Sequence, residues 1–295
     1  MTRYCLILVV LGVFGGLVLL SQPLGAHPDL VLQIEEYSEQ ISENPQDTEL
    51  LIRRGDLCRR HGDWAAAEDD FQSVRELTPD HPMIDWYEGR LLMEAGRSSE
   101  ADAMLTRFLN VRNDHAGAYQ ARAVARQDLH QDLLAAGDFQ AAVDNSEQPA
   151  PSLYRSLVMS LVGIGIDQIE VAITAVNDGL KRFPREVSLI GLGVDLSLAQ
   201  ADSQQALKYL SGIPPRLGDL LQWQFRKAVL VCIQGDKKAA ASAFSAILSD
   251  TQNSSRQRAG TWRLPVDIVT KLAENPNVKD CSQAAWSKLT QTYAG

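Results

Sequence analysis

The histidines are the side chains of this sequence best suited to metal or acid–base chemistry, because imidazole ionises near neutral pH and binds transition metals. There are five. If a leader were removed after Ala26, His27 would become the first residue, and its free amine and ring nitrogen could hold copper together. His81 and His115 lie 34 positions apart and could approach each other, or could be solvated loop residues. We expect no resident metal and no cofactor, and we keep as an alternative a metal-handling or enzyme-associated exported protein that uses His27 at its N-terminus.

Catalytic signatures give no support to an enzyme. The sequence has no HExxH, no GxSxG and no phosphate-binding GxxxxGK[ST]. Gly163 and Gly165 lie inside a helical pattern without a third glycine at the spacing of a nucleotide loop. Acidic residues such as Asp69 and Asp70 fit solvated helix faces. With 28 basic and 37 acidic residues, the net charge of −9 gives no general attraction to nucleic acid. We expect a protein that is not an enzyme and has no nucleic-acid partner.

The N-terminal stretch 1–26 has the layout of a secretory signal peptide. Arg3 supplies a positive charge, residues 5–20 are uncharged and apolar, and Ala26 is a small residue before a cleavage point. The apolar run is short for a membrane span, which needs about 20 residues. We therefore expect an exported protein, periplasmic or secreted. The alternative is an uncleaved N-terminal membrane anchor with the rest of the chain outside the cytoplasm.

The three cysteines after that segment are scattered and form no CxxC motif, so they do not define a disulfide scaffold. Cys232 and Cys281 could pair if the C-terminal segment folds back. Otherwise Cys58 and Cys232 are small buried helical residues.

A repeated spacing organises the rest of the chain. Stretches that begin at Gly62, Gly96 and Gly235 each have an alanine five residues later and a large apolar residue four after that. The alanine series has successive spacings of 34, 41, 30, 34 and 34, and consists of Ala67, Ala101, Ala142, Ala172, Ala206 and Ala240. Such a period indicates stacked helix pairs, each with a small residue where its two helices cross.

The first copy carries the clearest pattern, Leu51-x2-Arg54-Gly55-x2-Cys58, then Ala67-x3-Phe71, then Pro79. It resembles the tetratricopeptide repeat (TPR), whose pattern is W-x2-L-G-x2-Y, A-x3-F and P. The resemblance covers residues 48–250 and implies an all-α fold, an α-solenoid of about six TPR-like helix pairs. Residues 27–47 are expected to form an N-terminal half-repeat helix, and residues 251–295 a C-terminal helical cap.

The third copy is expected to be irregular. Its first helix, residues 117–136, would carry seven extra residues, close to two turns. Gly137 would then stand at the turn, and Ala142 at the helix crossing. Ser146 would replace the large apolar residue, and two prolines, Pro149 and Pro151, would cut the second helix short.

The resemblance also implies where a partner would bind, because in TPR proteins extended peptides usually lie along the first helices. The spacing predicts a groove that combines arginines, which suit carboxylates, with aromatic residues, which are frequent in interfaces. Its candidate residues are Arg53, Asp56, Arg59, Arg60, Trp86, Tyr87, Arg90 and Met93. Alternatively, Trp86 and Tyr87 pack between units and the arginines are only solvated.

Later units carry apolar residues on the same face, either as an apolar floor or as a contact with the cap: Tyr154, Leu157, Leu161 and Leu198. The sequence therefore predicts a non-catalytic interaction scaffold or adaptor outside the cytoplasm. It would bind a protein or extended peptide in its concave groove, and would touch a membrane only through an uncleaved signal segment.

Overall fold

A computed structural model describes residues 28–253, and this part of the chain contains thirteen α-helices, two short 3-10 helices and no strand. The first seven helices are α1 (Pro28–Glu43), α2 (Thr48–His61), α3 (Trp64–Leu77), α4 (Ile84–Glu94), α5 (Ser98–Val111), α6 (Ala116–Asp128) and α7 (Asp132–Asp144). They are followed by α8 (Pro151–Ile164), η1 (Ile166–Gln168), α9 (Ile169–Arg182), α10 (Val187–Ala199), α11 (Ser203–Leu210), η2 (Pro215–Leu217), α12 (Leu221–Ile233) and α13 (Lys237–Asn253).

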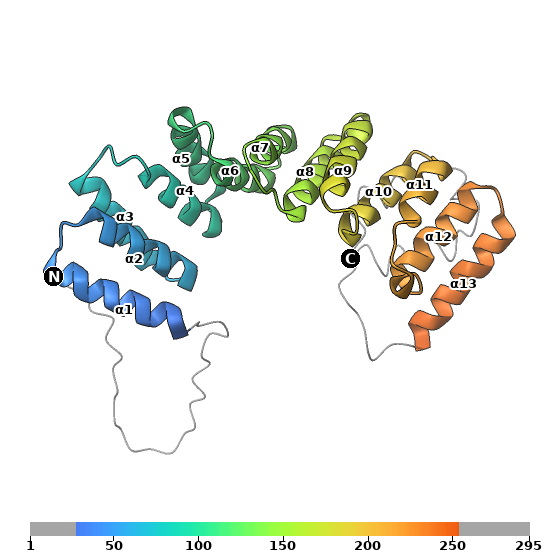
Figure 1. The fold of residues 1–295 in the computed structure, drawn as a ribbon, viewed down its shortest axis with the longest axis horizontal. Helices are drawn as coiled ribbons and strands as arrows, with labels where there is room; N and C mark the ends of the chain where they lie inside the picture. Colours follow the sequence, from blue (N-terminus) through green and yellow to red (C-terminus); the bar gives the residue numbers. More distant parts are fainter. Residues whose placement is uncertain (1–27, 254–295) are drawn as a thin grey trace, which may run out of the picture.

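Twelve of these helices form six antiparallel pairs, here called units one to six, from α2/α3 to α12/α13. Figure 1 shows the pairs following one another in an arch, with α1 beside α2 at the N-terminal end. In the N-terminal half, α2 and α4 lie nearer the hollow of the arch than α3 and α5. The all-α solenoid of about six pairs is confirmed, while the predicted cap at residues 251–295 lies almost entirely outside the described residues.

Within a unit, a small residue on the first helix faces a large one on the second. A Cβ placed on Gly55 would lie only 2.5 Å from the ring of Phe71, and one on Gly193 only 2.7 Å from the ring of Tyr209. In unit four two valines, Val158 and Val176, hold the corresponding positions, and both are fully buried. The first helix can therefore approach its partner closely in two ways. Either a glycine faces an aromatic ring, or two side chains of medium size face each other.

The alanine series marks the second crossing point in each unit. Each unit has an alanine with no exposed surface at the same place in its second helix, and the series is Ala67, Ala101, Ala135, Ala172, Ala206 and Ala240. Its successive spacings are 34, 34, 37, 34 and 34. The spacing of the alanines is thus more regular than the sequence alone predicted.

The predicted irregularity of the third unit is wrong. Its helices are Ala116–Asp128 and Asp132–Asp144, so Ala135 and Phe139 take the positions given to Ala142 and Ser146, and Gly137 lies inside a helix. The error has a simple cause. Ala135 and Ala142 are seven residues, about two helical turns, apart on one face of α7, and both are fully buried.

The turn between the helices of a unit explains why this register was missed. In units one, two and six a glycine has a positive φ there, at Gly62, Gly96 and Gly235. In units three and five the same position is occupied by His130, with φ 56°, and Ala201, with φ 58°. Only glycine takes such angles without strain, so its absence removed the turn signal from the third unit.

The irregularity is in unit four instead. Its first helix, α8, ends at Ile164, and Gly165 and the short η1 helix lead into α9. Gly163 and Gly165 therefore belong to a helix end and its turn, which agrees with their not forming a nucleotide loop.

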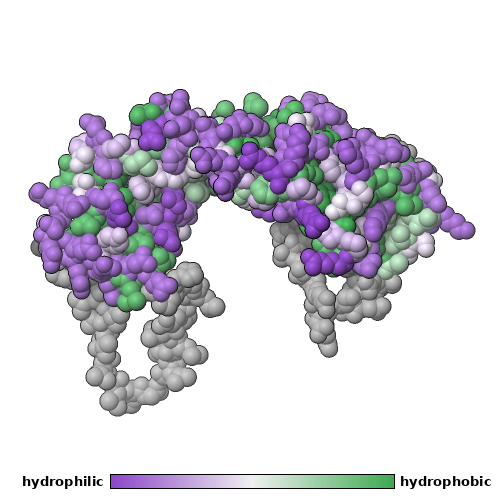
Figure 2. All heavy atoms as spheres, viewed as in Figure 1, coloured by the Kyte–Doolittle hydropathy of each residue, from purple (hydrophilic) through white to green (hydrophobic). Residues whose placement is uncertain are grey.

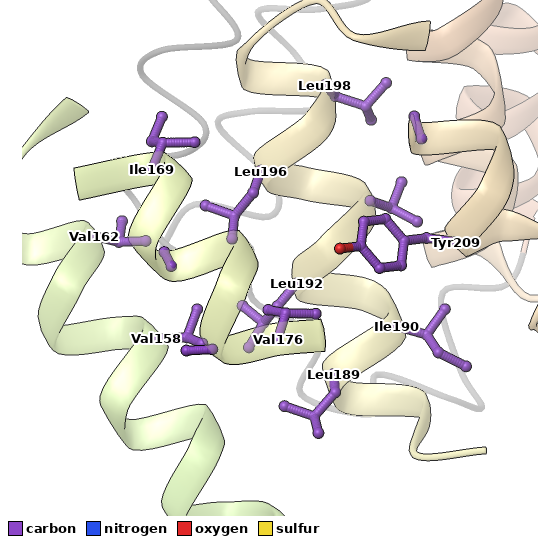
Figure 3. Packing of buried hydrophobic residues seen from close by; sticks show 14 of the residues in the cluster. Val158, Val162, Ile169, Val176, Leu189, Ile190, Leu192, Leu196, Leu198 and Tyr209 are labelled. Atoms are coloured by element: carbon purple, nitrogen blue, oxygen red, sulfur yellow. The ribbon is translucent and has the colours of Figure 1, made fainter. Parts of the chain in front are cut away.

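Three groups of buried apolar side chains form the core, two in units one to three and the largest from unit three to unit six. Figure 3 shows part of the largest, where Tyr209 from α11 lies on the same side of α10 as Ile190, while Leu192 and Leu196 point to the other side, toward α9. Cys58 is a buried thiol, whereas Cys232 is buried and disulfide-bonded. Cys281, its suggested partner, lies outside the described residues.

Candidate functional site

The eight predicted groove residues lie on two neighbouring first helices, four on α2 and four on α4. These helices are in contact, and ion pairs join them directly. The stack therefore brings the predicted set together on one surface. We call this the N-terminal inner surface and define it by those eight residues.

Arg59 is the buried centre of this surface. Its side chain is only 3% exposed, its Nε and Nη2 donate to Asp56 Oδ1 at 3.0 and 2.9 Å, and its Nη1 donates to Glu94 on the next unit. Because both flanking carboxylates accept from it, Arg59 holds the floor of the surface together. A partner would meet its neighbours before it met Arg59.

Arg90 lies beside that network and is less completely neutralised. Its Nη1 is 3.5 Å from Asp56 Oδ1, a long contact, and its guanidinium lies 5.0 Å from the ring centroid of Trp86. Burial and the nearby positive charge of Arg59 lower the pKa of Arg90. Arg90 is thus half-buried over an aromatic ring, with room to exchange a weak carboxylate contact for a stronger one.

Trp86 also packs between units. Its ring centroid lies 4.7 Å from that of His115 and 6.0 Å from that of Phe108, and a Cβ on Gly117 would lie 3.2 Å from it. Tyr87 likewise packs on Phe71, with centroids 5.9 Å apart. Both aromatic residues therefore pack between units, as one alternative drawn from the sequence predicts. Both also keep part of their surface exposed, which the groove alternative requires.

His115 is the N-cap of α6, not a solvated loop residue. Its Nδ1 accepts a hydrogen bond from the backbone N–H of Ala118 at 3.0 Å, while its ring lies against Trp86 and Phe108. Burial lowers the pKa of His115, and the neutral imidazole is the form that can accept this bond.

The exposed part of the N-terminal inner surface is cationic and amphipathic. Arg60 is exposed and makes no ion pair with any residue from 28 to 253. Arg53 is exposed and paired with Glu49 one turn away, and Met93 is half-buried. Figure 2 shows hydrophilic side chains over most of the visible face of the arch, with smaller apolar groups between them.

The sequence analysis missed the ion pairs that join the helices of a unit. Arg54 donates to both carboxylate oxygens of Asp70 at 2.9 and 2.6 Å, and Asp70 is 3% exposed, so its predicted solvated position is wrong. Arg122 and Asp138 make the same pair, with distances of 2.8 and 2.7 Å. Both residues lie 68 positions, two regular repeats, after the first pair, and this recurrence could have revealed them.

The inner surface changes character along the arch. When positions are counted from the crossing residue of each first helix, Ile233 on α12, the counterpart of the exposed Arg60, is half-buried. The other positions of α10 and α12 that correspond to the groove positions of α2 are buried. They are Gly191, Val194, Ser197 and Leu198 on α10, and Arg226, Val229 and Cys232 on α12. The polar N-terminal inner surface, on α2 and α4, thus has mostly buried counterparts in units five and six.

Residues 28–253 hold no group of three or more His, Cys, Asp or Glu side chains that could bind a metal ion, and His27 lies just outside that range. None of their helices is long and apolar enough to cross a membrane.

Similarity to known proteins is found in structure alone, since no protein-family model and no curated protein sequence matches this chain. YrrB, described as a TPR protein with an unusual peptide-binding site, is 17% identical, with a TM-score of 0.52 over 71% of this chain and 98% of its own. PilW, a type IV pilus biogenesis factor, is 16% identical, with a TM-score of 0.53 over 67% and 90%. PilF of Pseudomonas aeruginosa is 13% identical, with a TM-score of 0.51 over 77% and 97%. Together with the repeat pattern, these likenesses show that the described chain has the TPR fold.

Proposed function

We propose that this protein is a non-catalytic scaffold that binds a protein or an extended peptide on its N-terminal inner surface, outside the cytoplasm. The observation that carries the proposal is the pair of exposed arginines on α2, Arg53 and Arg60, with the half-buried Arg90 of α4 and half-exposed aromatic rings beside them. Arginine recognises carboxylates through paired hydrogen bonds, and aromatic anchors supply apolar contact. A partner segment with carboxylates fits this chemistry, and the peptide-binding site attributed to YrrB is an analogy on the same fold.

The placement outside the cytoplasm is supported by two features. The stretch 1–26 has the order of a signal peptide, and Cys232 is disulfide-bonded. Disulfides persist mainly in oxidising compartments. Mass measurement of protein recovered from the exported fraction tests this placement. A chain that starts at His27 is expected, and a chain that retains residues 1–26 would indicate a membrane anchor.

The binding proposal is tested by crosslinking and capture of the partner, followed by titration with variants. We expect Arg60→Glu to weaken binding at least tenfold, because an exposed positive charge that approaches a carboxylate becomes negative. Added salt should also weaken binding, since salt screens exposed charges. The matched control is Arg185→Glu, which makes the same charge change at an exposed position between α9 and α10. Equal affinities for the two variants would place the binding surface elsewhere.

The metal-handling alternative depends on His27 and has its own test. The mature protein would take up one copper ion per chain, and His27→Ala would abolish the uptake. An equal copper content in both proteins would remove this alternative.

A further inference from the structure

The first helix of the last described unit is buried over more than half of its circumference. On α12 the buried residues are Trp223, Phe225, Arg226, Ala228, Val229, Leu230 and Cys232. At 100° per residue these positions cover an arc of about 220°, and the exposed Lys227 lies in the remaining arc. Among the described elements, α12 contacts α10, α11 and its own partner α13. No further unit follows α13 among residues 28–253, and the end of a solenoid needs a capping element.

The preceding first helix, α10, is buried on all sides. Every residue of α10 from Leu189 to Leu198 is buried. In α2 the groove-facing Arg53 and Arg60 are exposed. Their counterparts on α10, counted from the crossing glycine of each helix, are Gly191 and Leu198, and both are buried. A helix that is apolar on all sides is typical of one enclosed on all sides.

The disulfide of Cys232 indicates that another segment of the chain lies at the inner surface of α12. Cys232 corresponds to Arg59 in the repeat, a groove position, and its disulfide partner is not among residues 28–253, where Cys58 keeps its thiol. Two other cysteines exist in the sequence, Cys5 and Cys281. Cys5 belongs to the segment that export would remove, and this step of the argument rests on the proposed export.

The length and composition of the C-terminal segment fit the same place. Cys281 follows Asn253, the end of α13, by 28 residues, which can span up to about 90 Å when extended. If residues 280–292 are helical, as their sequence predicts, Ala285 and Leu289 share the side of Cys281, so an apolar face would accompany the cysteine.

We infer that the C-terminal segment, residues 254–295, covers the inner surface of units five and six and is attached there by a Cys232–Cys281 disulfide. The chain thereby fills the apolar end of its own groove and leaves the N-terminal inner surface as the open part. An external partner would thus meet units one and two first.

Peptide mapping of the intact exported chain without reduction is the first test. A peptide that joins Cys232 to Cys281 is expected. A link from Cys232 to Cys5, a link between two chains, or a free thiol at Cys281 would overturn the inference.

The second test asks whether the segment covers these helices, using hydrogen–deuterium exchange on the full chain in a Cys281→Ser background. Leu289→Asp should raise amide exchange in α10 and α12 at least tenfold and leave α2 and α4 unchanged. Thr290→Asp is the matched control, because the neighbouring residue points away from the predicted apolar face. No rise with Leu289→Asp, or an equal rise with Thr290→Asp, would overturn the inference. Neither test involves a partner, so either can fail while the proposed binding function stands.

Discussion

The two ends of the arch use one repeat to build different inner surfaces. In units one to three, arginine–carboxylate pairs link neighbouring helices and polar side chains remain exposed. In units five and six most of the corresponding positions are buried and carry small or apolar side chains, apart from Arg226, which pairs with the buried Asp195. The residues that pack a unit together, such as Gly55 against Phe71 and Gly193 against Tyr209, are alike at both ends. Packing and surface character are thus encoded at separate positions of the repeat, so one can change without the other.

The largest expected effect comes from breaking the buried ion pair at the C-terminal end. Asp195 accepts from Arg226 Nε and Nη2 at 2.7 and 2.5 Å, and both side chains are almost fully buried. Asp195→Ala would remove both of these charge-assisted hydrogen bonds from the buried guanidinium of Arg226, and we expect it to lower the free energy of unfolding by about 3–5 kcal/mol. Asp70→Ala is the comparison at the N-terminal end, where Arg54 is 26% exposed and can turn to water. Urea unfolding should show a clearly smaller loss for Asp70→Ala, and equal losses would contradict the difference between the ends.

Overpacking the helix crossings should have a similar effect at both ends. Ala67→Leu and Ala206→Leu each insert a larger side chain where no surface is exposed, and should cost about 1–3 kcal/mol. Ala65→Leu is the control, because Ala65 is exposed on the same helix as Ala67. Unchanged unfolding midpoints for the two buried variants would mean that the alanine series is not a packing feature.

Relaxing the two strained turns should stabilise the protein. Ala201→Gly and His130→Gly remove a side chain from a left-handed backbone position, and each should add about 0.5–1 kcal/mol to the free energy of unfolding. The reverse change, Gly62→Ala, should destabilise the first unit by about 1 kcal/mol. Thermal unfolding of the three variants checks the signs, and a loss of stability in both glycine variants would contradict the strain.

The smallest effect is a pH dependence at the N-terminal end. The pKa of His115 is lowered below its ordinary value of 6.5, with burial as the main cause, although Asp114 nearby acts in the opposite direction. The unfolded state therefore binds more protons as pH falls through 6.5, and stability should decrease below that pH. His115→Asn keeps a side chain that can cap the helix but does not titrate, so its stability should change less between pH 7 and pH 5. An identical pH dependence in the two proteins would exclude His115 as the cause.

The sequence predicted the helix pairs because their packing positions recur, as Gly55, Ala67 and Phe71 show. It misplaced the third unit because His130 takes a glycine's backbone angle and because two turns of α7 carry equivalent alanines, Ala135 and Ala142. The positions of the groove residues followed from the period alone. Their interactions did not, because whether an arginine is exposed like Arg60 or buried like Arg59 depends on a carboxylate in the next unit, Glu94.

The division of the inner surface is tested most directly by hydroxyl-radical footprinting of the intact exported chain, with each rate corrected for the intrinsic reactivity of the residue. The account predicts that Tyr87 and Met93 are modified readily and that Leu198 and Trp223 are protected at least tenfold, since the latter two are each 1% exposed. Equal corrected rates at the two ends would contradict an arch whose inner surface is open at units one and two and covered at units five and six.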